Sequence, residues 1–166
     1  MHTPNVVVAW ATAVHRAVED ARTGLGVDGR ELSALTLVAE HEGCSLDWLR
    51  HRVGLTQSGT VRLVDRLAGR GLLEREVASG RSVPLRVTPA GRRVLADWAD
   101  ERDRAVDGLL AVLPDRQRDQ LLGALRAAVQ RTPRDRRTAD ATCGSCTWPA
   151  CGSDCPVDLS VTDESA

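Results

Sequence analysis

The stretch LTQSGTVRLVDRLAGRGLLERE, residues 55–76, together with GRSVPLRVTPAGR, residues 80–92, decides the fold. Its first part has a threonine cap and apolar residues at helical spacing, which predicts a helix over 57–70. Its middle alternates apolar and polar residues on both sides of a short turn at Gly80, which predicts a two-stranded hairpin. Thr88-Pro89 is a cap followed by proline at the first helical position, so a new helix starts there.

Further helices are expected on both sides of this stretch. Apolar residues at i, i+3/i+4 and i+7 spacing predict helices over 5–22, 29–42 and 46–53 upstream, and over 90–113 and 115–130 downstream. Asp28 and Glu31 have the spacing of a capping box at the start of the second of these helices. Three helices followed by a hairpin form a winged helix-turn-helix. The predicted fold class is therefore mainly α with a small two-stranded β-wing.

The chain divides into four predicted segments. They are an N-terminal dimerisation helix (1–27), a winged helix-turn-helix DNA-binding domain (28–90), two C-terminal dimerisation helices (91–132), and a linker with a cysteine-bearing tail (133–166). The helices at both ends of the winged domain carry apolar faces that must be covered somewhere. A second copy of the chain would cover both faces, so we expect a homodimer.

Charge is unevenly distributed along the sequence. All 22 basic residues are Arg, and the formal net charge is −1. Residues 50–93 nevertheless carry ten Arg against three acidic residues, whereas residues 140–166 carry five acidic residues and no basic one. This pattern predicts a basic core that binds a polyanion and an acidic tail that does not join it. A solvated Arg face without a partner is the alternative.

The winged segment resembles the multiple-antibiotic-resistance regulator (MarR) family of transcription factors. The matching pieces are TQSGTVRLVDRL for the recognition helix, GRGLLER entering the wing and LRVTPAGR leaving it. The resemblance implies a homodimer on a pseudo-palindromic double-stranded DNA operator, most simply as a repressor that responds to a small ligand. At the wing tip this chain has Ser79-Gly80-Arg81 where the family has Asp-Arg-Arg, so only the last arginine is kept.

A recognition helix places the exposed side chains of its N-terminal part against base edges in the major groove. Gln pairs well with adenine and Arg with guanine, while Ser and Thr bond to bases or phosphates. Arginines of the wing suit phosphates or the minor groove. The predicted DNA-binding residues are therefore Gln57, Ser58, Thr60, Arg62 and Arg66 on the helix, and Arg81 and Arg86 on the wing.

Four cysteines near the C-terminus form a second motif. Their spacing is C-x2-C-x4-C-x3-C-P, from Cys143 through Cys146 and Cys151 to Cys155. A dense set of thiolates selects zinc or an iron–sulfur cluster. We expect a metal at these four cysteines and slightly favour Zn²⁺, because no other cysteines remain for the second cluster of a ferredoxin-type pair. A redox-active thiol pair is the third possibility.

Three functional hypotheses remain open. The first is a ligand-responsive regulator with a structural zinc site, the second is an iron–sulfur redox sensor, and the third is a protein-interaction adaptor that does not bind DNA. No nucleophile–base pair and no nucleotide-binding glycine loop is present in the sequence, so we do not expect an enzyme. Without an apolar run of membrane-spanning length or a signal segment, the chain is expected to be cytoplasmic and to have no membrane partner.

Overall fold

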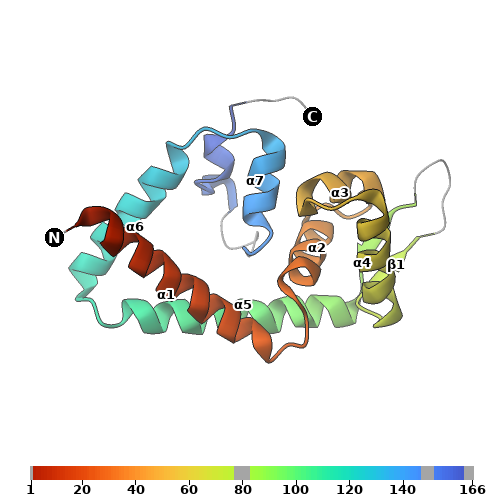
Figure 1. Ribbon diagram of the computed structural model, residues 1–166, viewed down its shortest axis with the longest axis horizontal. Helices are drawn as coiled ribbons and strands as arrows, with labels where there is room; N and C mark the ends of the chain where they lie inside the picture. The colour runs from red at the N-terminus through yellow and green to blue at the C-terminus, as the bar shows by residue number, and fades with distance from the viewer. Residues whose placement is uncertain (1, 77–82, 147–151, 163–166) are drawn as a thin grey trace.

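The computed structural model describes residues 2–76, 83–146 and 152–162. Figure 1 shows a largely helical chain with one small hairpin. Its elements are α1 (Thr3–Thr23), α2 (Gly29–Glu40), α3 (Leu46–Val53), α4 (Gln57–Gly69), β1 (Leu73–Arg75), β2 (Leu85–Val87), α5 (Pro89–Leu110), α6 (Asp115–Gln130), α7 (Arg136–Cys143) and the short 3-10 turns η1 (Gly152–Asp154) and η2 (Asp158–Ser160). The predicted fold class, mainly α with a two-stranded wing, is confirmed.

The helices of the winged domain begin at the residues whose side chains were expected to cap them. Asp28 and Glu31 form both halves of the capping box at α2. Ser45, Thr56 and Thr88 accept hydrogen bonds from backbone N–H groups in the first turns of α3, α4 and α5. Each of these hydroxyls satisfies a donor that has no partner within its helix, which fixes where the helix starts.

One apolar core holds α2, α3, α4 and the hairpin together. Its fully buried side chains come from every one of these elements and from α5, and the largest are Leu35, Leu37, Leu49, Leu63, Leu67, Leu73, Leu85 and Trp98. The hairpin pairs Leu73 with Val87 in antiparallel register. The other side of β2 bonds to the segment after α2, through Gly43 N to Leu85 O and Leu85 N to Cys44 O. Backbone hydrogen bonds thus join the wing to the segment that follows α2.

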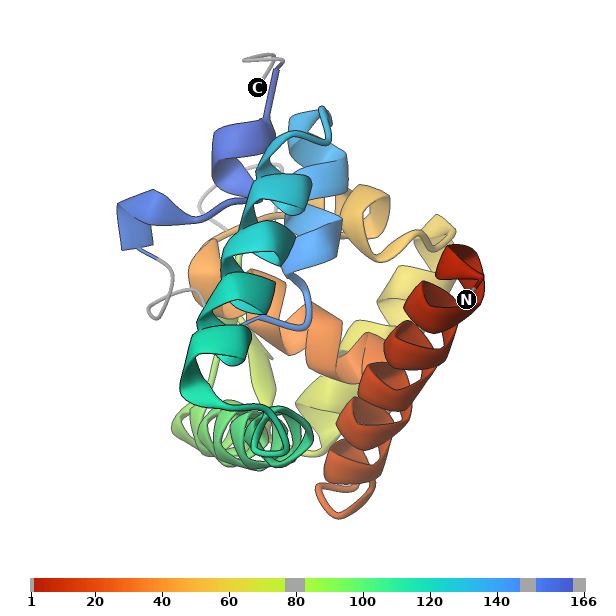
Figure 2. The ribbon, with the colours of Figure 1, turned by 90° about the vertical axis from the view of Figure 1, so that its left-hand side faces the viewer.

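A helical arm leads away from the winged domain. Helix α1 lies along α5, and α6 turns back from the far end of α5 (Figures 1 and 2). Neither α1 nor α6 has a buried residue within this chain. Large apolar side chains remain exposed on the arm, among them Val6, Val7, Val8, Val112, Leu122 and Leu125. Within the described residues, no helix is both long and apolar enough to cross a membrane.

The C-terminal segment differs from the expected linker. Residues 136–143 form helix α7, whose N-cap Asp135 accepts a hydrogen bond from the Thr138 N–H. The segment also folds back on itself, because Arg134 pairs with Val161 in an isolated parallel bridge. Few apolar residues mark α7, so the hydrophobic period that predicts a helix is missing there. Its cap and tertiary packing hold it instead.

The expectation that the acidic tail stays apart from the basic core is also wrong. Helix α7 packs against α3 and α2 of the winged domain. An ion pair links them, from Arg52 Nε on α3 to Asp140 Oδ2 on α7 at 2.6 Å. The acidic charge of the tail therefore serves in part to bind an arginine of the basic segment.

Candidate nucleic-acid interface

Helix α4 presents a polar N-terminal face to solvent. Gln57, Ser58 and Arg62 are exposed there, after the Thr56 cap. Arg62 forms no ion pair or hydrogen bond with any residue that the structure describes, so its guanidinium donors are available to a ligand. A guanidinium that is free at a helix face is the group that best pairs with the O6 and N7 atoms of guanine. Arg62 is thus placed as the sequence predicted.

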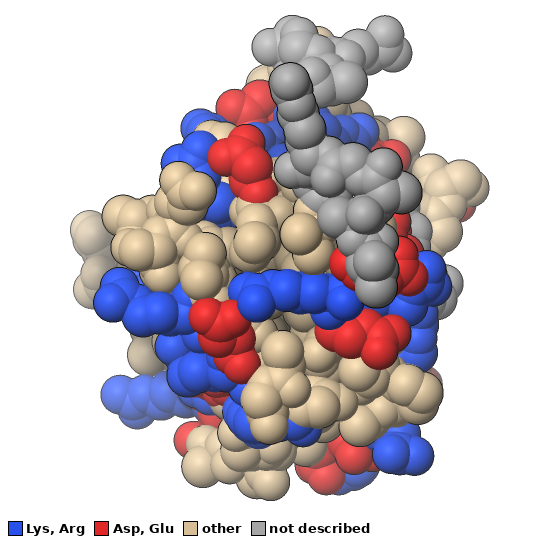
Figure 3. Space-filling view, turned by 90° about the vertical axis from the view of Figure 1, so that its right-hand side faces the viewer, with Lys and Arg blue, Asp and Glu red and all other residues tan. Residues whose placement is uncertain are grey.

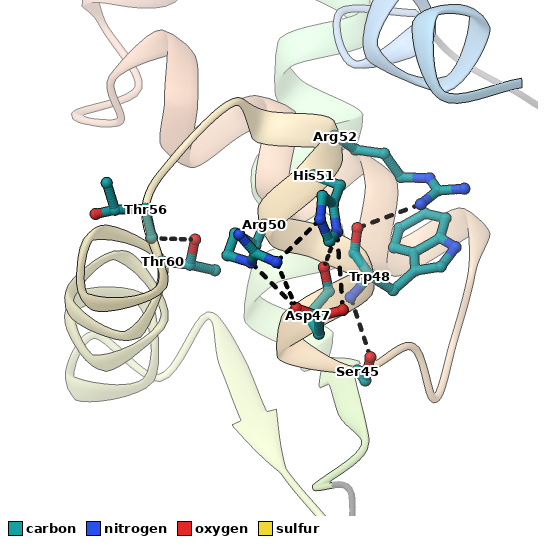
Figure 4. Close-up of polar contacts among 8 residues, drawn as sticks. All are labelled: Ser45, Asp47, Trp48, Arg50, His51, Arg52, Thr56 and Thr60. Atoms are coloured by element: carbon teal, nitrogen blue, oxygen red, sulfur yellow. Dashed lines mark hydrogen bonds and ion pairs between the residues drawn. The ribbon is translucent and has the colours of Figure 1, made fainter. Parts of the chain in front are cut away.

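The predicted exposure of Thr60 is wrong. Thr60 was expected on the exposed face of α4, but only 1 % of its surface is exposed. Its hydroxyl donates to the backbone carbonyl of Thr56 at 3.1 Å (Figure 4). Helical periodicity explains the error, since Thr60 precedes Leu63, Val64 and Leu67 by three, four and seven positions and so shares their buried face. A buried hydroxyl that is already bonded cannot read a base.

A pocket of about 360 Å³ lies beside the N-terminal half of α4. It is lined by the turn before the helix and by three arginines: Arg30, Gly54, Leu55, Thr56, Gly59, Arg62, Leu63 and Arg66. Arg30 comes from the first turn of α2 and was not predicted. Its sequence distance from α4 leaves no local signal, and only the packing of α2 on α4 brings it there. Three guanidinium groups around one pocket favour binding of a phosphate.

Two of the predicted arginines, Arg66 and Arg86, are bound by carboxylates of this chain. Arg66 Nε lies 3.4 Å from Glu31 Oε1, whose other oxygen lies 2.9 Å from Nη1 of Arg70, a residue that was not predicted. Arg86, on the wing, contacts Glu76 at 2.5 Å and Glu42 at 3.2 Å. Figure 3 shows the resulting surface, on which blue and red side chains alternate. The basic excess counted along the sequence is thus partly neutralised in the fold.

The wing itself is described only at its base. Residues 77–82, including the predicted DNA contact Arg81, lie outside the described residues. At the base, Arg75 bonds Asp65 of α4 at 2.8 Å. Arg92, in the first turn of α5, contacts Glu42 together with Arg86. These ion pairs fasten the hairpin to α4, to the end of α2 and to α5.

The structure brings together the three tail cysteines that it describes. Cys143 and Cys155 are buried in one small apolar cluster with Ala139 and Val157. The Cys143 thiol donates a hydrogen bond to Cys146, which lowers the pKa of Cys146 to about 7. Cys151, the fourth predicted ligand, lies outside the described residues. Among the described residues alone, no group of three or more His, Cys, Asp or Glu side chains is arranged to hold a metal ion.

Cys44 is set apart from that cluster. It lies between α2 and α3, and its burial raises the pKa of the thiol from 9.0 to about 11. A thiol whose pKa is raised in this way is protonated at neutral pH and reacts slowly. Cys44 is therefore a packing residue.

Solved structures of similar fold come from several bacteria. CouR from Rhodococcus jostii RHA1, bound to p-coumaroyl-CoA, is 29 % identical over 74 % of this chain and 88 % of its own, with a TM-score of 0.54. A MarR-family transcriptional regulator from Rhodococcus sp. RHA1 is 27 % identical over 77 % of this chain and 94 % of its own, with a TM-score of 0.58.

A third structure includes DNA. A MepR variant from S. aureus bound to an oligodeoxyribonucleotide has a TM-score of 0.65 over 78 % of this chain and 96 % of its own, at 14 % identity, which shows the fold alone. No curated protein sequence matches the chain. The family model described as MarR family matches residues 25–82, which span α2, α3, α4 and β1. Residues 25–82 of this chain thus match the MarR-family model, and the fold around them is similar to that of a MarR-family regulator.

Proposed function

We propose that this protein is a sequence-specific, DNA-binding transcriptional regulator, most simply a repressor, and not an enzyme. The observation that carries the proposal is the exposed face of α4, where Gln57, Ser58 and Arg62 lie in the N-terminal half of the helix that would enter the major groove. Among the described residues, Arg62 has no ion-pair or hydrogen-bond partner. Arg30 and Arg66 flank it around the pocket and are suited to the DNA backbone. The MarR-family match and the DNA-bound neighbour support the same reading.

The experiment compares Arg62→Ala with the wild-type protein on a selected operator and on random double-stranded DNA. A bidentate arginine–guanine contact contributes about 1–3 kcal/mol of discrimination, so operator binding should weaken by roughly 5- to 150-fold while random DNA binding changes little. Arg81→Ala should instead weaken both, because a phosphate contact carries no sequence information. Equal losses on both DNAs for Arg62→Ala would refute its assigned role.

A matched control is available on the arm. Arg104 is exposed on α5 and bonded to Glu101 at 2.6 Å, well removed in sequence from α4. Arg104→Ala removes the same charge and should leave the operator preference unchanged. A loss equal to that of Arg62→Ala would mean that net charge, rather than the face of α4, determines binding.

We also propose that the protein acts as a homodimer on a pseudo-palindromic operator. The exposed apolar side chains of α1 and α6 support this, because a face of this kind on a soluble protein marks an interaction site. A two-fold dimer presents two recognition helices to two half-sites. The dimers and operators of the family agree with this arrangement.

The regulatory signal is proposed to be a small ligand or the state of a metal at Cys143, Cys146, Cys151 and Cys155. CouR with p-coumaroyl-CoA is an example of a neighbour with a small molecule bound. For the metal, the burial of Cys143 beside Cys155 and the hydrogen bond to Cys146 support a shared site. Four thiolates would close a tetrahedral zinc site, and Zn²⁺ is slightly favoured over an iron–sulfur cluster.

Metal analysis of protein purified without oxygen separates these alternatives. Colourless protein with one zinc per chain supports the zinc site, whereas brown protein with iron and sulfide supports the redox sensor. Cys155→Ser should abolish stoichiometric metal, and Cys44→Ser should keep it, since Cys44 lies outside the cluster. Wild-type protein without metal, or metal retained in Cys155→Ser, would exclude the proposed site.

A further inference from the structure

A buried ion pair fastens the cysteine-bearing tail to the helix-turn-helix. Arg52 Nε on α3 lies 2.6 Å from Asp140 Oδ2 on α7, and the two side chains are only 15 % and 6 % exposed. The other carboxylate oxygen of Asp140 lies 3.9 Å from Arg136 on its own helix. Removing one partner of a buried pair leaves an uncompensated charge, so such a contact favours one docked position strongly.

Arg52 is itself held in place from two sides. Its guanidinium lies over the Trp48 ring, 3.8 Å from the ring centroid, and donates to the Trp48 carbonyl at 3.3 Å (Figure 4). Trp48 in turn contacts the His41 ring in a tilted arrangement, with ring centroids 4.5 Å apart. Arg52 stands four positions before Thr56, the cap of the recognition helix. The tail therefore contacts the helix-turn-helix directly before α4 begins.

Close packing and further hydrogen bonds hold the tail against three other helices, α2, α5 and α6. A Cβ built on Gly144, which caps α7, would lie 2.2 Å from Ser33 Oγ and 3.2 Å from Ser33 Cβ on α2, so a larger residue fits there only if the Ser33 hydroxyl rotates away. From α5, Arg102 donates to the Ser145 carbonyl at 3.1 Å. From α6, Arg126 donates to the Asp154 carbonyl at 2.6 Å.

The docked tail adds a further link between the arm and the winged domain. The chain already joins them where α1 leads into α2 and where α5 begins, and the further link runs from α6 through α7 to α3 (Figures 1 and 2). Each further attachment point leaves two joined bodies less freedom to rotate against one another. Because the arm holds the proposed dimer contact, the docked tail helps to set where each α4 lies relative to the two-fold axis.

We propose that Arg52 and Asp140 are positioning residues for operator recognition. By fixing α7 on α3, they hold the two recognition helices of the dimer at the separation that the half-sites require, which is about 34 Å or a multiple of it. Helix α7 lies on the side of α3 away from the wing in Figure 1, so the docked tail leaves the face of α4 open to DNA. The inference rests on the proposed operator binding and adds the residues that preorganise it.

The test is Asp140→Asn in the full chain, which keeps the shape of the side chain and removes its charge. Operator affinity should fall about tenfold, a typical coupling between distant sites, while affinity for random DNA stays at the wild-type value. Asp158→Asn is the matched control, because Asp158 bonds Arg136 at 2.5 Å within the tail and, among the described residues, forms no ion pair or hydrogen bond with α3. Metal content is measured in both variants, so that a loss at the cysteines is not mistaken for a loss of docking.

A second pair of variants tests the docking of α7 at another contact, without any change of charge. Gly144→Ala brings a methyl group against the Ser33 side chain, which should loosen the packing of α7 on α2 and weaken operator binding in the same direction as Asp140→Asn. Adding Ser33→Ala removes the hydroxyl that the new methyl group meets and should restore most of the operator affinity. Rescue by a residue of α2 distinguishes tail docking from general damage to the cysteine segment.

Hydrogen exchange of the α7 amides reports docking independently of DNA. Faster exchange together with the tenfold loss in Asp140→Asn supports the proposal. An operator-to-random ratio that is the same in Asp140→Asn, Asp158→Asn and the wild type overturns it, whatever the exchange rates, and leaves the proposed function intact. If the wild-type chain binds no DNA sequence in preference to random DNA, the proposed function is refuted, and the positioning role is refuted with it.

Discussion

Gly91, in the first turn of α5, is the site of a close approach between backbone segments. A Cβ there would lie 2.2 Å from the Leu72 carbonyl oxygen and 2.7 Å from Val87 Cγ1. Neither atom can move freely, because Leu72 and Val87 belong to the hairpin base that packs on the core. This glycine lets α5 start directly against the wing, which is the joint between the winged domain and the arm.

Gly91→Ala should therefore destabilise the protein by about 1–3 kcal/mol, the usual result of forcing a methylene into a packed site. The free energy of unfolding is measured in urea at a fixed protein concentration. Gly69→Ala is the control, since nothing lies within 4 Å of its built Cβ on α4. A neutral Gly91→Ala would show that the joint is looser than the contact distances indicate.

The Glu31 carboxylate links α2 to α4. It closes the capping box of α2 by accepting from the Asp28 N–H at 3.1 Å, and it also binds Arg66 and Arg70 of α4. Its side chain is buried, so these bonds replace the water that a charged group would otherwise need. The position of α4, and of the pocket that Arg66 lines, therefore depends on Glu31.

Glu31→Gln should lower the free energy of unfolding by about 1.5–3 kcal/mol, the range for hydrogen bonds to charged groups. Glu101→Gln breaks an exposed pair with Arg104 and should change it by less than about 1 kcal/mol. Both values come from urea titrations under the same conditions. Similar small changes for the two variants would mean that α4 is held by its apolar face alone.

The elements that the sequence predicted well are those defined by local chemistry. Asp28, Ser45, Thr56 and Thr88-Pro89 each act within a few residues, so the starts of α2 to α5 could be read directly. Helix α6 matches its predicted range, Asp115–Gln130, because Pro114 stands at the N-cap position directly before it. Local patterns are sufficient wherever the capping residue and the helix it caps are neighbours in the sequence.

What the sequence missed depends on contacts between distant residues. Arg52 and Asp140 are 88 positions apart, and no local pattern marks either as a partner. Arg30 reaches the pocket beside α4 only through the packing of α2. The ion pairs of Arg66 and Arg86 reduce the basic surface that a simple count of charges suggests. Such contacts follow from tertiary packing, which periodicity does not encode.

At the scale of the whole molecule, the arm carries apolar side chains that the described residues of one copy leave exposed. Leu122 and Leu125 on α6 are 44 % and 43 % exposed, and three consecutive valines of α1 are exposed as well. Covering such a face by a second copy removes apolar area from water and adds stability that one chain lacks. The dimer would then be the unit that binds DNA.

Leu125→Glu should shift the protein toward monomer, because a buried carboxylate without a partner opposes association. The molar mass in solution is measured by sedimentation, together with operator affinity, and both should fall. Leu159→Glu is the control, since Leu159 is equally exposed, at 50 %, but lies in the tail. A Leu125→Glu protein with the mass of a dimer would place the interface elsewhere.

Selection of DNA from a random double-stranded pool by the wild-type full chain tests the central claim most directly. The proposed function predicts an enriched sequence with two inverted half-sites that is bound by two chains. The logarithm of the affinity for this sequence should fall linearly with the logarithm of the salt concentration. Arg62→Ala should lose the preference for that sequence. A pool that stays random after selection, or binding that ignores salt, would contradict the assignment of α4 as a recognition helix.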